Sequence, residues 1–247
     1  MVVHQIDDFD VAEFASIAAR FGHDRYGYVV TPNVDHLIRF HEDAAFREHY
    51  RNAAYVLMDS RFVAYVLRVT KQVKLRVCTG SDLTAELLAR AIAPADRVVM
   101  IGGSTEQAEK IASVHGLRNM QHYNPPMGFI RDPAAVEACL QFIERASPFR
   151  YCFLAVGSPQ QEAIAELLRS RGRARGLALC IGASLNFITG AEKRAPRWMQ
   201  QLALEWLYRL LRDPQRLAHR YLVRGPRIFA HLRRAEIVLR RPMPTPG

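Results

Sequence analysis

Small polar side chains and one carboxylate stand where predicted strands of this chain end. Thr31 and Asn33 lie in a Thr-Pro-Asn turn after the strand Tyr26–Val30, and Asp59 follows the apolar run Ala53–Met58. Because the carboxyl ends of parallel strands meet at one edge of a sheet, we expect these side chains to share one crevice that binds a ligand. On local grounds alone, capping of the following helices explains them about equally well.

Glycine-containing turns add backbone amides to the same predicted edge. Gly102 and Gly103 follow the strand Arg97–Ile101, and such a turn can bring its amides close to a phosphate. The chain has neither a GxGxxG fingerprint nor a P-loop, so a dinucleotide or ATP site is not supported. The residues expected to meet in one crevice are Thr31, Asn33, Asp59, Gly102, Gly157, Gln161 and Gly182.

The triplet Asp8-Phe9-Asp10 has the DxD form found at metal sites of many sugar transferases. It precedes the predicted helix 8–21 instead of ending a strand, which favours Asp10 as the helix N-cap. We therefore expect no metal site there.

Predicted strands and helices alternate six or seven times, which indicates a mostly parallel sheet covered by helices. One helix, 132–145, begins at Asp132-Pro133, a cap followed by a first-turn proline. The predicted strands are Tyr26–Val30, Ala53–Met58, Leu75–Cys78, Arg97–Ile101, a strand within Leu117–Phe129, Tyr151–Val156 and, as the last one, Leu177–Ile181.

The composition is that of a folded protein of 247 residues, with 49% hydrophobic and 23% charged residues. Four scattered cysteines without a CxxC pair predict buried, reduced thiols, as in a cytoplasmic protein. The N-terminus lacks the pattern of a signal peptide, and no apolar run approaches the roughly 20 residues that span a bilayer. Any contact with a membrane is therefore expected to be peripheral.

The positive charge of the chain is concentrated in its C-terminal quarter. From Lys193 onward there are 13 Lys and Arg residues against three acids, a net +10 that equals the charge of the whole protein, so residues 1–192 are neutral. Tryptophans and tyrosines interleave with these cations, which indicates a local surface for an anionic partner. We predict a catalytic core over 1–192 and a basic helical appendage over 193–247.

The spacing of the appendage arginines predicts two basic helical faces on either side of Asp213-Pro214. Arg209 and Arg212 are three apart, whereas Arg216, Arg220 and Arg224 are spaced by four. Apolar residues on the remaining surface suit a segment that lies on an anionic membrane. The alternatives are a solvated basic helix packed on the core and a non-catalytic domain that binds RNA or DNA, although no RNP, KH or zinc-finger pattern is present.

Together these motifs resemble the WecG/TagA/CpsF glycosyltransferases, glycosyltransferase family 26, over about residues 20 to 230. The resemblance rests on TPNVDHL, the strand-terminal Asp59, TGSDL, IGGS, GSPQQE, IGASLNFITGAEKRAPRWMQ and LEWLYRLLRDPQRLAHRY. It implies an inverting, metal-independent enzyme without a cofactor, with a Rossmann-like domain. Such an enzyme moves a sugar from a UDP-sugar to a polyprenyl-diphosphate-linked saccharide on the inner face of the plasma membrane. The resemblance implies no nucleic-acid partner, and it is compatible with a homo-oligomer.

The resemblance also assigns roles to individual residues. It places the catalytic base at Asp59 and a polar pair of the first turn at Thr31 and Asn33. It places the glutamine of the GxPxQE loop at Gln161, and arginines that reach over the diphosphate at Arg209, Arg216 and Arg220. The turns at Gly102, Gly103, Gly157 and Gly182 are expected to bind substrate because they follow predicted strands.

Three positions depart from the common family pattern and leave the donor sugar open. The chain has Asp59-Ser60 where many members have Asp-Gly, Gln160 where they have Lys, and Asn186 where they have Asp. The expected donor is a UDP-hexose such as UDP-glucose, used in exopolysaccharide assembly, with UDP-N-acetylmannosamine or its uronic acid as the alternative. A nucleotide-sugar oxidoreductase would need the dinucleotide fingerprint that is missing.

Overall fold

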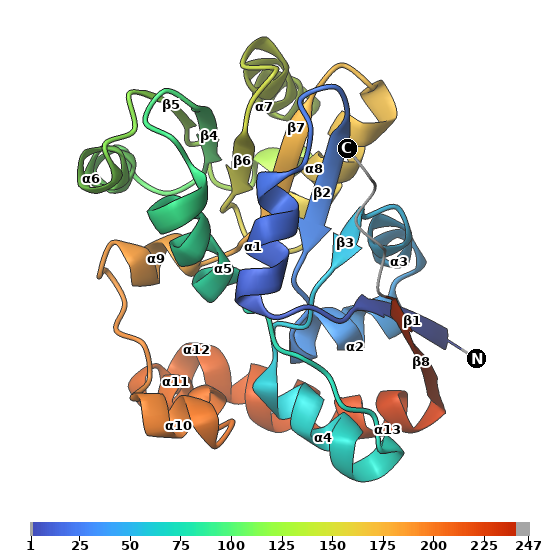
Figure 1. Cartoon of the computed structure of the whole chain (residues 1–247). Helices are drawn as coiled ribbons and strands as arrows, with labels where there is room; N and C mark the ends of the chain where they lie inside the picture. The colour runs from blue at the N-terminus through green and yellow to red at the C-terminus, as the bar shows by residue number, and fades with distance from the viewer. Residues whose placement is uncertain (1, 241–247) are drawn as a thin grey trace.

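A six-stranded, fully parallel sheet forms the centre of the protein in the computed structural model, which describes residues 2–240. Its strand order is β3-β2-β7-β6-β4-β5, and helices lie on both faces (Figure 1). The predicted α/β, Rossmann-like fold is therefore confirmed. The strands are β2 (Tyr26–Val30), β3 (Tyr55–Val56), β4 (Arg97–Ile101), β5 (Asn119–Tyr123), β6 (Tyr151–Leu154) and β7 (Gly176–Cys180).

Helices connect the strands and then continue into the C-terminal segment. The helices of the core are α1 (Val11–Ala19), α2 (Val34–Glu42), α3 (Ala44–Arg51), α4 (Arg61–Lys71), α5 (Gly80–Glu86), α6 (Thr105–His115), α7 (Pro133–Arg145), α8 (Gln160–Arg171) and α9 (Ser184–Ile188). Those of the appendage are α10 (Arg197–Gln201), α11 (Glu205–Arg212), α12 (Pro214–Ala218), the π-helix η3 (His219–Arg224) and α13 (Arg227–Arg234).

Strand β7 shows why the central strands are apolar throughout. Its residues Leu177 and Leu179 pack with α1, α5 and α6, whereas Ala178 and Cys180 pack with α3, α7 and α8. Successive side chains of a strand point to opposite faces, and helices cover both faces here, so every position is buried. The four cysteines are buried and free, as predicted.

Two predicted helix starts are confirmed in detail. Asp10 is the N-cap of α1: its carboxylate accepts a hydrogen bond from the backbone N–H of Glu13, and Glu13 returns one to the backbone of Asp10. This reciprocal pair is a capping box. Asp132 caps α7 by accepting a hydrogen bond from the N–H of Ala134, with Pro133 in the first turn.

The prediction of a strand over Leu75–Cys78 is wrong. This segment is extended, but its backbone hydrogen bonds go to scattered partners instead of a neighbouring strand. The N–H of Arg76 binds the carboxylate of Asp8 at 2.8 Å, and the N–H of Cys78 binds the carbonyl of Met58 at 2.9 Å. The strand predicted over Ala53–Met58 is reduced to the two residues Tyr55–Val56, although the N–H groups of Leu57 and Asp59 still bind the carbonyls of Val30 and Pro32.

Two further strands were not predicted, and they join the ends of the described chain. Strand β1 (Val2–Asp7) pairs in parallel with β8 (Ala235–Arg240), so Leu177–Ile181 does not contain the last strand. The buried carboxylate of Asp7 accepts hydrogen bonds from the Val56 N–H at 2.7 Å and from Arg240 at 2.8 Å. The appendage is thereby fixed to the edge of the core. Residues 241–247 of the predicted appendage lie outside the described residues.

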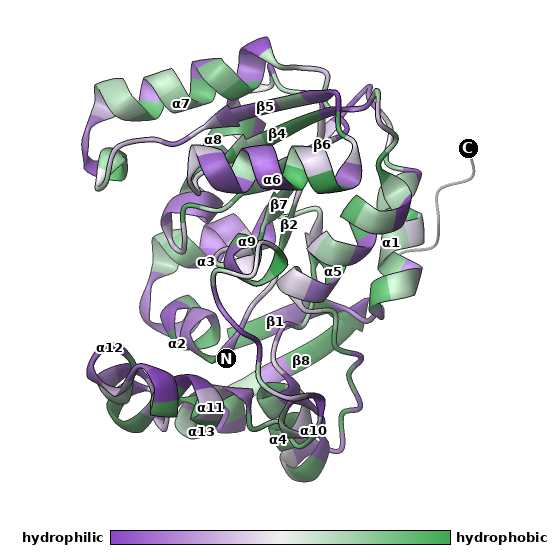
Figure 2. Cartoon of the chain, turned by 90° about the vertical axis from the view of Figure 1, so that its left-hand side faces the viewer, coloured by the Kyte–Doolittle hydropathy of each residue, from purple (hydrophilic) through white to green (hydrophobic). Residues whose placement is uncertain are grey.

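The appendage helices form a layer beneath the sheet together with α4 (Figures 1 and 2). A small hydrophobic core joins this layer to the rest of the protein. Its buried members are Ile6, Leu37, Ile38, Met58, Val63, Val66, Leu67, Ile228 and Leu232, from β1, α2, α4, α13 and the end of β3. In addition, Lys71 of α4 donates a hydrogen bond to the carbonyl of Ala235 at 2.7 Å.

Three histidines meet where the appendage contacts helix α2. The Nε2 atoms of His4 and His41 are 2.8 Å apart, and the ring of His231 stacks on His41 at 4.6 Å. Burial lowers the pKa of His4 to about 3, with contributions from His41 and Arg47. Burial also lowers the pKa of His41 to about 4, with His231 as the next cause. Both rings are therefore neutral in the folded protein at pH 7.

The lowered pKa values of His4 and His41 predict that the folded protein loses stability in acid. Histidine in the unfolded chain has a pKa near 6.5, so between about pH 6.5 and pH 4 the unfolded state binds more protons than the folded state. Stability then falls as the pH is lowered, by about 1 kcal/mol per pH unit for each linked histidine. We expect the Tm to drop by several degrees between pH 7 and pH 5, and to drop less in His41→Gln.

The control is His23→Gln, which removes an exposed histidine. An equal fall in Tm for His41→Gln, His23→Gln and the unchanged protein would contradict the role of the histidine pair.

Candidate active site

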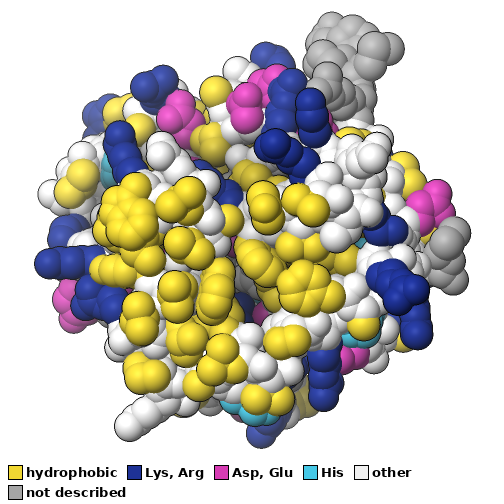
Figure 3. Space-filling model, turned by 90° about the horizontal axis from the view of Figure 1, so that it is seen from below, with side chains coloured by type: hydrophobic (Ala, Val, Ile, Leu, Met, Phe, Trp, Pro, Cys, Tyr) yellow, Lys and Arg dark blue, Asp and Glu magenta, His cyan; other side chains and the backbone are white. Residues whose placement is uncertain are grey.

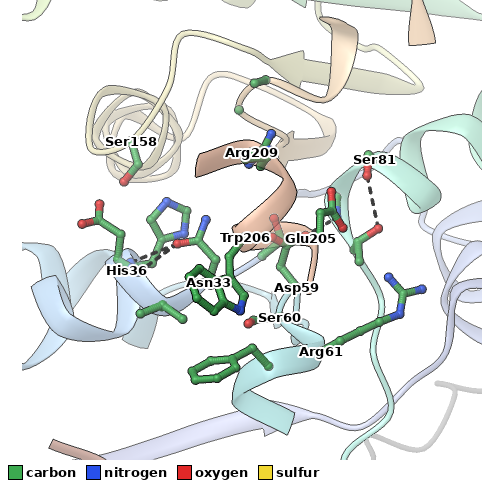
Figure 4. Close-up of a pocket in the computed structure, with 18 of the residues that line it drawn as sticks. Asn33, His36, Asp59, Ser60, Arg61, Ser81, Ser158, Glu205, Trp206 and Arg209 are labelled. Carbon is green, nitrogen blue, oxygen red and sulfur yellow. Dashed lines mark hydrogen bonds between the residues drawn. The ribbon is translucent and has the colours of Figure 1, made fainter. Parts of the chain in front are cut away.

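A cavity of about 700 Å³ lies between the carboxyl edge of the sheet and the appendage (Figure 4). The core side consists of the turns after β2, β3, β6 and β7 and the start of α5. The appendage side consists of residues from α11, η3 and α13. This is the crevice that the alternation of strands and polar turns predicted, and the appendage closes its open side.

Asp59 has one carboxylate oxygen fixed and the other available. Its Oδ1 accepts a hydrogen bond from the Gly80 N–H at 2.9 Å, and no protein donor reaches Oδ2 within residues 2–240. The side chain lines the cavity, and the N-cap of α4 is Ser60, whose hydroxyl accepts from the Val63 N–H. The capping alternative for Asp59 is therefore wrong.

Burial raises the pKa of Asp59 above its ordinary value. The Gly80 hydrogen bond, His36 and Arg209 act in the opposite direction, whereas the carboxylate of Glu205 adds to the rise. A raised pKa makes a carboxylate a stronger base than a solvated aspartate, provided that it stays ionised at working pH.

Thr31 and Asn33 both line the cavity, but their local roles differ. Asn33 is the N-cap of α2, because its Oδ1 accepts from the N–H groups of Asp35 at 3.0 Å and His36 at 3.4 Å. The same oxygen lies 3.4 Å from a guanidinium nitrogen of Arg220. Thr31 is buried and donates its hydroxyl to the Cys180 carbonyl. The capping alternative is thus confirmed for Asn33, which also faces the appendage.

Gln161 connects the turns that follow β6 and β7. Its Oε1 accepts from the Gly182 N–H at 2.8 Å, and its Nε2 donates to Glu162 at 2.9 Å. The side chain is 2% exposed, so it acts mainly by holding the Gly182 turn in place. Gly157 and Gly182 line the cavity with positive φ angles of 79° and 53°, which glycine adopts without strain.

Gly102 and Gly103 lie outside the cavity lining. They follow β4, which is separated from β2 by β6 and β7 in the sheet. Their turn leads into α6, where Ser104 and Gln107 form a capping box. The structure therefore brings together Thr31, Asn33, Asp59, Gly157, Gln161 and Gly182 but leaves the Gly102-Gly103 turn apart.

Of the three arginines expected over the diphosphate, the structure brings Arg209 and Arg220 to the cavity. Arg216 is not part of the lining; it is exposed and pairs with Asp213 at 2.6 Å. Arg224 pairs with Asp35 and Glu42 of α2.

The prediction that Arg216, Arg220 and Arg224 share one helical face is wrong. The chain enters a π-helix at His219, in which the Gly225 N–H binds the carbonyl of Arg220 five residues earlier. Arg220 reaches Asn33 and Arg224 pairs with Asp35, whereas Arg216 is exposed and pairs with Asp213.

Several cavity residues were not singled out from the sequence. Arg194 is held by a hydrogen-bonded ion pair with Asp82, and Arg194 and Arg209 both lie over the ring of Phe187. Burial favours protonation of Asp82, but the Arg194 and Thr79 hydrogen bonds outweigh it and lower its pKa. Other such residues include His36, Arg61, Gly80, Ser81, Ser158, Glu205 and Trp206. For Arg194 the signal was its place among the cations after Lys193.

The arrangement suits the transfer of a group away from an anionic leaving group. The carboxylate of Asp59 faces the cavity with one free oxygen, and Arg61, Arg194, Arg209 and Arg220 line the same cavity. Within the described residues, no group of three His, Cys, Asp or Glu side chains is suited to hold a metal ion. Cations from the protein itself are therefore available to balance developing negative charge.

Comparison with known families gives one match that covers nearly the whole chain. The model described as "Glycosyl transferase WecG/TagA/CpsF family" matches residues 2–242. The matched range includes the sheet, the cavity and every described helix of the appendage.

Proposed function

The chain belongs to the WecG/TagA/CpsF glycosyltransferase family, and we propose on that basis that it moves a sugar from a UDP-sugar to a polyprenyl-diphosphate-linked saccharide. In this proposal the transfer inverts the anomeric centre, needs no metal ion and serves the synthesis of a cell-surface polysaccharide. The observation that carries it is the open Oδ2 of Asp59, which lies in the same cavity as the appendage arginines.

Inverting transfer needs one base and a stabilised leaving group. Asp59 takes the proton from the acceptor hydroxyl while the oxygen of that hydroxyl forms a bond to the anomeric carbon. The bond from that carbon to the diphosphate breaks, and the electron pair leaves with UDP. A single carboxylate suffices, because no covalent sugar intermediate is formed.

Arg209 and Arg220 are the proposed partners of the departing diphosphate. They approach from the appendage side, and Gly157 and Gly182 present backbone from the core side. Preorganised cations and amides aimed at developing charge supply a large part of such a rate enhancement. The donor sugar is proposed to be a hexose such as glucose, with N-acetylmannosamine or its uronic acid as the alternative.

The cavity position of these arginines also weighs against nucleic-acid binding. Arg209 and Arg220 line the cavity, while Arg216 and Arg224 are ion-paired within the protein. A binder of RNA or DNA instead presents its cations on an open surface that follows the phosphate backbone.

An exposed apolar face next to the cavity supports peripheral membrane binding. No described helix is long and apolar enough to cross a membrane. The underside of the molecule gathers hydrophobic side chains with basic residues around them (Figure 3). Exposed members on the appendage are Trp198, Leu202, Leu211, Leu222, Val223 and Phe229. We propose that this face docks on the anionic inner surface of the plasma membrane, where the lipid-linked acceptor resides.

The role of Asp59 is tested by Asp59→Asn. The amide keeps an acceptor oxygen for the Gly80 N–H but cannot take a proton, so we expect kcat to fall roughly 10²- to 10⁴-fold. Radiolabel transfer to a lipid-linked acceptor measures the rate, and calorimetry with UDP is expected to show unchanged binding. Asp24→Asn, at an exposed turn, is the control. Full turnover by Asp59→Asn would refute the assignment of the base.

The arginines offer a matched pair of variants on neighbouring turns. Arg220→Ala removes a cavity cation, and we expect kcat to fall about 10²-fold because the leaving group loses one stabilising charge. Arg216→Ala removes an exposed arginine paired with Asp213, and we expect activity within about twofold of the unchanged protein. Equal losses from both variants would contradict the cavity assignment.

Membrane docking is tested with the double variant Leu211→Glu and Val223→Glu. Burying two such side chains in lipid contributes on the order of 1.5 kcal/mol each, and the added carboxylates are repelled by anionic lipid, so we expect binding to fall at least tenfold. Cosedimentation with phosphatidylglycerol vesicles gives the affinity. Val114→Glu replaces an equally exposed side chain on α6, away from this face. Unchanged vesicle binding by the double variant would contradict the proposal.

A further inference from the structure

Glu205 is a second carboxylate of the cavity, and the appendage supplies it. It stands in the first turn of α11, lines the cavity, and lies beside Asp59 and Trp206 beneath Arg209 (Figure 4). It also acts electrostatically on both Asp59 and Arg194. The proposed base and Glu205 therefore face the same space from the core and from the appendage.

The charge of Glu205 has no direct partner within residues 2–240. No described side chain forms a hydrogen bond or ion pair with it. The nearby cations have other neighbours: Arg194 pairs with Asp82, and Arg209 lies over Phe187 at 5.0 Å. Glu205 thus remains available to a ligand.

A carboxylate at this place works against the binding of an anion. It repels Asp59, and it offsets part of the positive potential that the cavity arginines supply to a diphosphate. A useful partner for Glu205 is therefore an uncharged group that donates hydrogen bonds. Sugar hydroxyls are such groups, and an ionised carboxylate forms stronger hydrogen bonds with them than a neutral acceptor does.

Trp206 provides a suitable surface next to this carboxylate. Its indole lines the cavity and is held between Phe62 and Tyr221, with ring centroids 6.5 Å and 6.1 Å away. A flat apolar surface beside a hydrogen-bond acceptor matches a sugar ring, which has C–H groups on its faces and hydroxyls on its rim.

We propose that Glu205 binds hydroxyl groups of the acceptor sugar and thereby holds the attacking hydroxyl toward Asp59. This inference rests on the proposed function and adds an acceptor-binding residue to it. Glu205 accepts hydrogen bonds and takes no proton in the reaction. The proton of the attacking hydroxyl passes to Asp59, and the electron pair of the broken bond leaves with UDP.

The proposal has a consequence for the pH profile, because Glu205 is one of several groups around Asp59. Removing its negative charge lowers the pKa of Asp59 and moves the acidic limb of kcat/KM to lower pH. The other groups that act on Asp59 or are acted on by it are His36 of α2, Tyr50 of α3, Cys78 before α5, Arg194 before α10, and Arg209 of α11. All of these residues are retained in Glu205→Gln.

The test compares Glu205→Gln with Glu236→Gln, which removes an exposed glutamate from β8 of the same appendage. With a UDP-sugar donor and a synthetic polyprenyl-diphosphate saccharide, we expect Glu205→Gln to lower kcat/KM for the acceptor about 10- to 100-fold. UDP affinity by calorimetry should be unchanged or slightly tighter. Glu205→Asp should recover part of the loss, and Glu236→Gln should behave like the unchanged protein.

Three outcomes overturn the inference. The first is a kcat/KM for the acceptor within twofold of normal in Glu205→Gln. The second is an equal loss of UDP affinity and acceptor efficiency, together with a lower Tm and no shift of the acidic limb, which shows a structural role. The third is the absence of sugar transfer to any lipid-linked acceptor by the protein without substitutions. This outcome overturns the proposed function as well, which distinguishes it from the first two.

Discussion

The docking of the appendage on helices α2 and α4 is the interaction on which the site depends. Ile228 and Leu232 of α13 pack into a core with Leu37 and Val63, and strand β8 pairs with β1. Burying each such aliphatic side chain contributes on the order of 1.5–3 kcal/mol, so several of them fix the layer firmly. Without this docking, Arg209, Arg220 and Glu205 would not face Asp59. Hydrophobic packing against the middle of α2 therefore positions the charged groups that face its N-terminal end.

The cavity combines opposite charges from two sources. The core contributes Asp59, with Oδ1 fixed by Gly80 and Oδ2 available, and the appendage contributes arginines together with Glu205. Burial raises the pKa of Asp59 and so makes it a stronger base, while the Gly80 hydrogen bond, His36 and Arg209 act in the opposite direction. The two requirements of the proposed reaction, a base and a counter-charge for the leaving group, thus meet where the two parts of the chain join.

Much of the fold could be predicted from local patterns. Strands β2 and β4 begin and end at the predicted residues, because they are short apolar runs between turns. The short strands β1 and β8 could not be predicted, since each is stabilised by a partner more than 230 residues away. Leu75–Cys78 has the composition of a strand, but the carboxylate of Asp8 takes one of its backbone hydrogen bonds. Long-range partners determine the structure of β1, β8 and Leu75–Cys78.

The site shows the same division. Asp59, Thr31 and Gly182 could be predicted because position at a strand end is a local property. Arg216 was grouped with Arg220 because a spacing of four predicts one helical face, but Arg216 pairs with Asp213 at the start of α12, whereas Arg220 lies in the π-helix and lines the cavity. Glu205 could not be singled out, since its role depends on what lies opposite it across the cavity. Single-sequence patterns do not specify such contacts.

A crystal structure of the protein with UDP bound tests the central claim most directly, namely that core and appendage form one active site. The account predicts diphosphate oxygens within hydrogen-bond distance of the Arg209 or Arg220 guanidinium, in the cavity that contains Oδ2 of Asp59. A diphosphate bound at the Gly102-Gly103 turn, with both arginines away from it, would contradict the account.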